Sequence, residues 1–197
     1  MTPHRLPVAG VLLAAGAGRR MGRPKALVRD DRGVPFLDRA LGALVEGGCP
    51  EVVVVLGAAV DEARAVLDEA GWTEDPVVSV AVAEDWESGM GASLRTGLRA
   101  VQDAGALAAV VSLVDLPDVD GAVVHRLLSW LPVDQRMLAR AAYHVVPGHP
   151  VLLGREHWAG VAETAVGDRG AREYLAGRDV IAVECGDLAT GEDVDTL

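Results

Sequence analysis

The stretch that decides the fold runs from residue 8 to residue 25 and reads VAGVLLAAGAGRRMGRPK. It begins with a short continuous apolar run at 8–14, which is typical of a strand buried on both faces of a parallel sheet. It then becomes a glycine-rich loop that carries several cations. Because open α/β sheets bind ligands beyond the carboxyl ends of their strands, the stretch predicts a first strand that ends in a binding loop.

Apolar runs of strand length alternate with stretches of helical period along the rest of the chain. Strands are expected at 51–56, 77–82 and 107–114, with weaker candidates at 137–143, 151–153 and 180–185. Helices are expected at 36–45, at 60–70, around 94–101, after Asp120 as N-cap, and from about residue 155. Four strand-then-helix units in succession predict a three-layer α/β fold, with a mainly parallel sheet and helices on both faces.

The composition restricts the class of protein. The chain has 197 residues and a formal net charge of −11, and half of its residues are hydrophobic. These values exclude a disordered chain, and the length predicts one domain over residues 1–197. The acidic total argues against nucleic acid and anionic membranes as partners. The two cysteines, Cys49 and Cys185, are too few for a disulfide framework and are expected to be reduced thiols.

The first eighteen residues resemble a secretory signal in one respect, since an early arginine precedes an apolar stretch and small residues. The small residues run directly into the basic loop, however, so a buried strand followed by a glycine loop explains the stretch better. No apolar run approaches the roughly 18 residues that span a bilayer. We therefore expect a cytoplasmic protein without membrane segments, and the sequence does not indicate its oligomeric state.

The loop after the first expected strand reverses the sign of the local charge. Six of the fourteen residues from 19 to 32 are basic, and they include Lys25, the only lysine of the chain. Glycines bring backbone N–H groups close to an anion, while arginine and lysine side chains add donors and charge. The loop therefore predicts a phosphate-binding site.

Two common phosphate-binding motifs do not fit this loop. A dinucleotide-binding fingerprint needs G-x-G-x-x-G, whereas the glycines stand at 16, 18 and 22 and the second expected strand ends without an acidic residue. A P-loop needs Gly-Lys followed by Ser or Thr, whereas Lys25 follows Pro24 and precedes Ala26. A plain strand-to-helix turn would explain one glycine but not the cations.

Residues 13–25 resemble the L-A-A-G-x-G-x-R-M-G-x-x-K signature of the nucleotidyltransferases that join a nucleoside triphosphate to a phosphorylated acceptor. The chain is most similar to the MobA-like NTP transferase family, and within it to the molybdenum cofactor cytidylyltransferases. Further stretches occur in the order of the family: GMGASL at 89–94, DLP at 115–117, GHPV at 148–151 and GDRGAR at 167–172. The resemblance implies a Rossmann-like nucleotidyltransferase fold.

The resemblance also assigns roles within the glycine loop. It implies that Arg20 and Lys25 hold the triphosphate and offset the charge that develops on the α-phosphate and the leaving pyrophosphate. The nucleotide, including its base, would contact the loop at Ala14, Ala15, Gly16 and Gly18.

Asp115 directly follows the expected strand at 107–114, beside the phosphate loop. A carboxylate there is well placed to hold Mg²⁺, which prefers oxygen ligands, and similar enzymes use this aspartate as a metal ligand. The alternative is an aspartate that caps a turn before Pro117. By resemblance Asp187 would help to hold the metal, although the tail has Ala189 and Gly191 where the family commonly has aspartate and proline.

The stretch at 89–93 is expected to open a helix whose first-turn N–H groups face the nucleotide, through Gly89, Gly91 and Ser93. Capping of this helix by Ser88 is the alternative. A few residues earlier the family usually has Asn-Pro, whereas this chain has Glu-Asp at 84–85, which weakens any side-chain contact from that segment.

Three further residues would lie on the acceptor side of the cleft by resemblance: His149, Asp168 and Arg172. From the residues alone, a structural histidine, a turn-capping aspartate and a solvated arginine are equally good interpretations.

The expected activity is Mg²⁺-dependent transfer of a nucleoside monophosphate to a phosphorylated acceptor, with release of pyrophosphate. CTP and molybdopterin are favoured, because AAG at 14–16 resembles the cytidylyl branch and the Gly-Pro-Leu-Ala-Gly segment of the guanylyl branch is missing. Alternatives are transfer from GTP or to a sugar phosphate, a non-catalytic nucleotide-binding protein, and, more distantly, a dinucleotide-dependent dehydrogenase.

Overall fold

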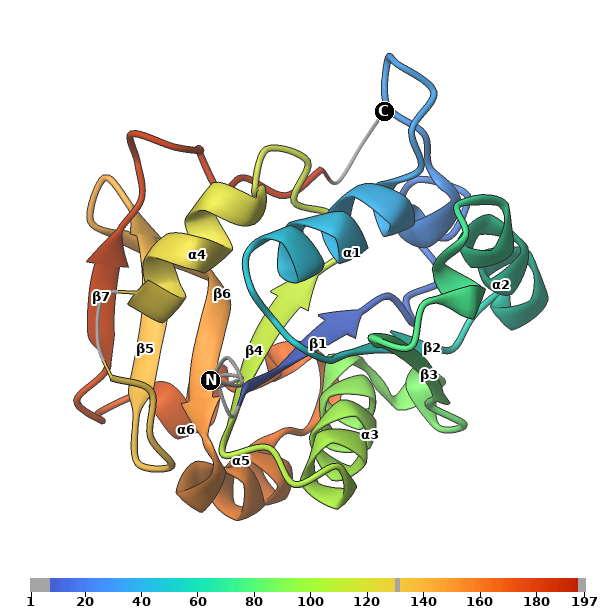
Figure 1. The fold of residues 1–197 in the computed structure, drawn as a ribbon. Helices are drawn as coiled ribbons and strands as arrows, with labels where there is room; N and C mark the ends of the chain where they lie inside the picture. Colours follow the sequence, from blue (N-terminus) through green and yellow to red (C-terminus); the bar gives the residue numbers. More distant parts are fainter. Residues whose placement is uncertain (1–7, 130–131, 195–197) are drawn as a thin grey trace.

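The computed structural model describes residues 8–129 and 132–194, and the strands in these ranges form one seven-stranded sheet (Figure 1). The strands stand in the order β3-β2-β1-β4-β6-β5-β7. Their bounds are Val8–Leu13 (β1), Val52–Leu56 (β2), Val78–Val82 (β3), Ala108–Leu113 (β4), Leu138–Tyr143 (β5), Val146–Gly154 (β6) and Ile181–Glu184 (β7). Neighbours among β1–β4 pair in parallel, β6 is antiparallel to both β4 and β5, and β7 is parallel to β5.

Helices cover both faces of the sheet. They are Phe36–Glu46 (α1), Val60–Glu69 (α2), Met90–Asp103 (α3), Gly121–Ser129 (α4), Trp158–Thr164 (α5) and Arg172–Leu175 (α6). Residues of α1, α2 and α4 belong to one buried cluster, and residues of α3, α5 and α6 to a second cluster on the other face. The expected three-layer architecture with a mainly parallel sheet is thus confirmed, and so are the four strand-helix units.

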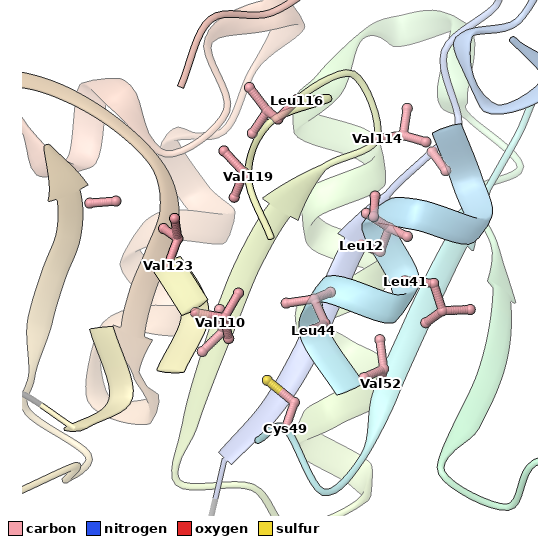
Figure 2. Close-up of a cluster of buried hydrophobic side chains, with 14 of the residues drawn as sticks. Leu12, Leu41, Leu44, Cys49, Val52, Val110, Val114, Leu116, Val119 and Val123 are labelled. Atoms are coloured by element: carbon pink, nitrogen blue, oxygen red, sulfur yellow. The ribbon is translucent and has the colours of Figure 1, made fainter. Parts of the chain in front are cut away.

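The core is built almost entirely from Val, Leu and Ala. Along β1, Leu12 packs into the cluster under α1 and α4, whereas Val11 and Leu13 pack into the cluster under α3. Figure 2 shows Leu12 beside Leu41 and Leu44 of α1. Because β1 is buried on both faces, it reads as the continuous apolar run seen in the sequence.

The topology brings most carboxyl ends of the strands to one edge of the sheet. β6 is antiparallel to β4, and β5 is antiparallel to β6, so β5 runs in the same direction as β4. β7 is parallel to β5. The loops after β1, β4, β5 and β7 therefore emerge at the edge where β6 begins, which we call the carboxyl edge.

Two expected elements differ from the structure. β6 begins five residues before the expected 151–153, because Val146 and Pro147 pair with the end of β5 across a turn at 144–145. The helix expected from residue 155 begins as a 3₁₀ turn, Arg155–His157, and becomes α5 only at Trp158. In both places the tertiary contact sets the bounds, and no local sequence signal marks it.

Both cysteines are buried and unpaired, as expected. Burial raises the pKa of Cys49 to about 12, so this thiol stays protonated and packs as a small apolar side chain. None of the helices in the described part of the chain is long and apolar enough to cross a membrane.

Candidate functional site

The glycine loop after β1 folds back on itself. Gly18 has a φ of +60°, and a Cβ there would lie 1.8 Å from the carbonyl oxygen of Arg23, so only glycine fits. Gly18 also accepts a hydrogen bond from the backbone N–H of Met21 at 2.9 Å. The fold-back leads to a 3₁₀ turn, Lys25–Leu27, which is anchored by the buried Ala26. Arg20 lies on the exposed turn between these points.

Lys25 and Asp115 lie together although 90 residues separate them in the chain. The Nζ of Lys25 donates to Oδ2 of Asp115 at 2.6 Å, and the two side chains are 18% and 14% exposed. β1 and β4 are neighbours in the sheet, so the loops that follow them share the carboxyl edge. The contact therefore places Lys25, which is expected to bind the triphosphate, beside Asp115, which is expected to bind the metal ion.

The donors around Asp115 suit Mg²⁺ only in part. Within the described residues, no group of three or more His, Cys, Asp and Glu side chains could hold a metal ion. Mg²⁺ commonly takes one or two carboxylates and completes its shell with water and substrate phosphates. Asp115 therefore fits an ion that arrives with a nucleoside triphosphate better than an ion resident in a protein cage.

Asp187, which is expected to help to hold the metal, pairs with an arginine in the structure. Both of its carboxylate oxygens accept hydrogen bonds from Arg126 of α4, the one at Oδ2 measuring 2.9 Å. This pairing is the first cause that lowers the pKa of Asp187. The structure gives no contact between this carboxylate and Asp115 in the described residues, and its role as a metal ligand stays a prediction.

A later part of the tail reaches Asp115 instead. The backbone N–H of Val194 donates to the carbonyl oxygen of Asp115 at 3.0 Å. Thr190 is tied to Asp118, whose Oδ2 accepts from the backbone N–H at 2.5 Å and from Oγ1 at 2.6 Å. The tail segment 190–194 therefore lies along the loop 115–118. The family pattern was matched over 187–193 with Asp187 as the metal ligand, so the contacts of residues 190 and 194 with this loop were not predicted.

The start of α3 is held by the segment after α5. The backbone N–H of Met90 donates to Oδ1 of Asp168 at 3.4 Å, and a Cβ on Gly91 would lie 2.2 Å from the carbonyl oxygen of Ala165. The GMGASL motif at 89–94 is thus in contact with the GDRGAR motif at 167–172. Gly89 is the N-cap residue of α3 and offers no side chain to cap it, so the expected capping by Ser88 is wrong.

This contact changes how the glycines of that motif are interpreted. A Cβ on Gly89 would lie 2.5 Å from the backbone of Gly167, so close packing already explains both Gly89 and Gly91. Ser93 is buried, with 5% of its surface exposed. The contact of these three residues with a nucleotide stays a prediction.

Part of the backbone expected to contact the base already forms hydrogen bonds with β2 and with the turn that follows it. The N–H of Ala14 donates to Val55, and the carbonyl oxygen of Ala15 accepts from Ala58. A base would therefore have to use the other backbone groups of this segment. The sequence reasoning also missed Trp86, which packs with Ala15 around Gly57, since a Cβ on that glycine would meet both side chains within 2.8 Å.

His149 lies at the start of β6, on the carboxyl edge. Its carbonyl oxygen accepts a hydrogen bond from the Tyr143 hydroxyl at 2.6 Å. Burial, followed by the charges of Arg140 and Arg172, lowers the pKa of its imidazole to about 4, against the opposing effect of Asp193. The imidazole is therefore neutral at pH 7. Arg140 is a second residue that the sequence missed, because it lies mid-strand and belongs to no motif.

A groove of about 650 Å³ lies elsewhere, between the end of α1 and α4, and its lining includes Glu46, His125 and Arg126. Neither Lys25 nor Asp115 lines it. The carboxyl edge is the better candidate site, because it carries Lys25 and Asp115, the residues that the sequence motifs single out.

Comparison with known proteins places the chain among nucleotidyltransferases. The model of the MobA-like NTP transferase domain matches residues 10–183. A relative named nicotine blue oxidoreductase, from Paenarthrobacter nicotinovorans, is 40% identical over 96% of this chain and 93% of its own length. A molybdenum cofactor guanylyltransferase from Rhodobacter capsulatus is 34% identical over 77% of this chain and 65% of its own length.

Solved structures agree with the fold. The crystal structure of Rv0371c from Mycobacterium tuberculosis H37Rv superposes with a TM-score of 0.77 at 30% identity, covering 100% of this chain and 95% of that one. Rv0371c has also been solved in complex with manganese, and that structure gives a TM-score of 0.71 at 26% identity over 95% of this chain and 93% of that one.

Proposed function

The chain belongs to the MobA-like NTP transferase family, and from this membership we propose that it transfers CMP from CTP to a phosphorylated acceptor such as molybdopterin. An oxygen of the acceptor phosphate bonds to the α-phosphorus of the nucleotide. The bond from that phosphorus to the bridging oxygen breaks, and inorganic pyrophosphate leaves with the bridging oxygen.

The observation that carries this proposal is the contact between Lys25 and Asp115. A phosphate loop alone is compatible with many kinds of anion site. Here a lysine from that loop lies beside a carboxylate that follows β4, the neighbour of β1 in the sheet. This arrangement suits a nucleoside triphosphate that binds together with a divalent metal ion. The arrangement needs no covalent intermediate, because transfer to phosphorus depends mostly on positioning and charge.

Each residue has a defined task in this mechanism. Lys25 leaves its pairing with Asp115 and binds the triphosphate, and Arg20 adds a second cation to the same group. Both cations offset the charge on the leaving pyrophosphate. Asp115 and the substrate phosphates would hold Mg²⁺, which when bound supplies further positive charge at the reacting phosphate. Support for a divalent ion comes from the manganese complex of Rv0371c.

The choice of base rests on two opposing observations. The AAG segment at 14–16 favours CTP, whereas the name of the guanylyltransferase relative favours GTP. Molybdopterin as acceptor is supported by the same relative's name. A sugar phosphate is the alternative acceptor, and localisation in the cytoplasm belongs to the same proposal.

The test is pyrophosphate release with Mg²⁺, each of the four nucleoside triphosphates, and molybdopterin or a panel of sugar phosphates. We expect release with CTP and molybdopterin, and loss of release in Asp115→Asn. Asp61→Asn, which changes an exposed aspartate of α2, is the matched control and should leave the rate unchanged. Release from GTP alone would overturn the choice of CTP. Nucleotide binding without turnover in the unchanged protein would identify a non-catalytic nucleotide-binding protein.

A second candidate function is that of an oxidoreductase. It is favoured by the 40% identity to the protein named nicotine blue oxidoreductase, over nearly the whole of both chains. The two candidates differ in the ligand that should stabilise the protein, because a ligand that binds the native state raises the melting temperature. Stabilisation by NADH or NADPH, without stabilisation by any Mg²⁺–nucleoside triphosphate, would favour the oxidoreductase.

A further inference from the structure

Arg140 of β5 holds its guanidinium against the start of β6. Its Nε and Nη2 both donate to the carbonyl oxygen of Gly148, at 3.2 and 3.1 Å. This fixes the guanidinium beside His149, the next residue along β6. The side chain is half-buried, and within the described residues no carboxylate forms an ion pair with it.

Arg172 faces the same region from another segment. Leu138 of β5 and Val151 of β6 pack in the cluster under α3, α5 and α6, and side chains alternate between faces along a strand. Arg140 and His149 therefore point to that same face. Arg172 begins α6, whose residues 174 and 175 belong to the same cluster. It is exposed and has no ion pair in the part of the chain that the structure describes.

The three side chains share one electrostatic environment. Burial, and then the charge of Arg172, lowers the pKa of Arg140, and both arginines lower the pKa of His149. The negative charge of Asp193 acts on the pKa of His149 in the opposite direction. Two arginines thus lie within range of each other's charge, in a chain whose net charge is −11. An anion between them would remove this repulsion.

We propose that Arg140, Arg172 and His149 form a second anion site, which binds the phosphate monoester of the acceptor. Arginine forks match the oxygens of phosphate, and a neutral imidazole can donate one further N–H. The backbone of Val194 bonds to Asp115, and the adjacent Asp193 acts on His149, so the second site adjoins the Asp115 loop. The role of the bound phosphate as acceptor rests on the proposed transferase function, whereas the anion site does not.

The first experiment uses inorganic phosphate as the probe and the imidazole NMR signal of His149 as the readout. The signal is assigned among the five histidines by its loss in His149→Gln. We expect a saturable shift on adding phosphate, and an increase of about 10–100-fold in the phosphate Kd in Arg172→Gln, as for loss of a charge-assisted hydrogen bond. Arg64→Gln, at an exposed arginine of α2, should leave the Kd unchanged.

Three results would overturn the site. One is a shift that does not saturate, which identifies non-specific salt binding. Another is an unchanged Kd in Arg172→Gln. The third is loss of the shift in Lys25→Ala, because phosphate would then be bound by the glycine loop rather than at β5 and β6.

The second experiment separates the site from the transferase activity. In Arg172→Gln and Arg140→Lys we expect the KM for the acceptor to rise about 10-fold or more, while the Kd for Mg²⁺–CTP by calorimetry stays unchanged. Arg140→Lys keeps the charge and tests whether the fork is required. A His149 shift without pyrophosphate release from any nucleotide leaves the anion site standing and rejects the transferase. Release with an unchanged acceptor KM rejects the role of this site in binding the acceptor and leaves the transferase standing.

Discussion

The two halves of the sheet differ in how they are held. The half formed by β3, β2, β1 and β4 is parallel, and every residue of β1 and β2 is buried. The half formed by β6, β5 and β7 mixes directions, contains a register irregularity between 140 and 142, and ends in an edge strand that is mostly exposed. The parallel half carries the proposed nucleotide loop at the end of a fully buried strand, whereas the mixed half carries the proposed acceptor site at the partly exposed start of β6.

The largest effect is expected at the glycine loop on the parallel half. Lys25→Ala should lower kcat by about 10²–10³-fold, because it removes a preorganised cation from the leaving pyrophosphate. The melting temperature should change much less than kcat, since the proposed task of Lys25 is to bind the triphosphate, for which it leaves its ion pair with Asp115. Steady-state pyrophosphate release measures the effect. Lys25→Arg should recover part of the rate, and Arg64→Ala should have none of the effect. A rate within threefold of the unchanged protein would place the triphosphate elsewhere.

The next prediction compares the cores of the two halves. Leu12→Ala, in the centre of β1, should lower the free energy of unfolding by about 2–5 kcal/mol, because the residue is fully buried between layers. Ile181→Ala, on the edge strand β7, should cost less than about 1 kcal/mol, because that residue is already 38% exposed. Urea unfolding of the three proteins measures both. Equal losses would show that β7 is held as tightly as the parallel centre.

The same difference explains how much of the fold could be predicted. The strands of the parallel half are predicted within two residues of their ends, because burial on both faces leaves a continuous apolar run. The start of β6 was missed because Val146 and Pro147 are exposed and resemble a loop. Their strand conformation comes from pairing with β5, which only the tertiary structure provides.

The site divides in the same way. Lys25 and Asp115 could be predicted because each follows a clear strand of the parallel half and has a distinctive local motif. The pairing of Asp187 with Arg126 could not be predicted, because the two residues are far apart in the sequence, and the expected place of Asp187 at the metal stays a prediction. Arg140 was missed because a single arginine in mid-strand carries no signal until His149 and Arg172 are seen beside it.

A smaller effect is expected where the tail crosses to the Asp115 loop. Thr190→Val removes the hydroxyl that donates to Asp118 and should cost about 1 kcal/mol of stability. It should also raise the Mg²⁺ concentration needed for half-maximal activity, because the tail then loses one of the hydrogen bonds that hold it against the loop of Asp115. Thr73→Val is the matched control, since its hydroxyl donates to Asp68 on the parallel half at 2.7 Å. A similar stability loss with an unchanged Mg²⁺ requirement in both variants would make the Thr190 tie purely structural.

The smallest effect concerns the turn between β5 and β6. His144 and Val145 both have positive φ values, of 50° and 66°, which is costly for side chains with a Cβ and most of all for a β-branched one. The carboxylate of Glu184 compensates by accepting from the backbone N–H groups of Val145, Gly186 and His144, and these bonds lower its pKa. The turn of the mixed half is therefore held by one charge rather than by packing.

Glu184→Gln should consequently lower the melting temperature slightly at pH 7, by an amount that depends on pH in a defined direction. A carboxyl whose pKa is lowered by folding stabilises the native state fully above its ordinary value of 4.5, and this contribution is lost as the pH falls through the folded pKa. The difference in melting temperature between the two proteins should thus be constant from pH 7 to about 5 and shrink below 4.5. Glu62→Gln, at an exposed glutamate of α2, should show no such change. A difference that persists unchanged at pH 3 would mean that the turn depends on the shape of the Glu184 side chain, as the parallel half depends on packing, rather than on its charge.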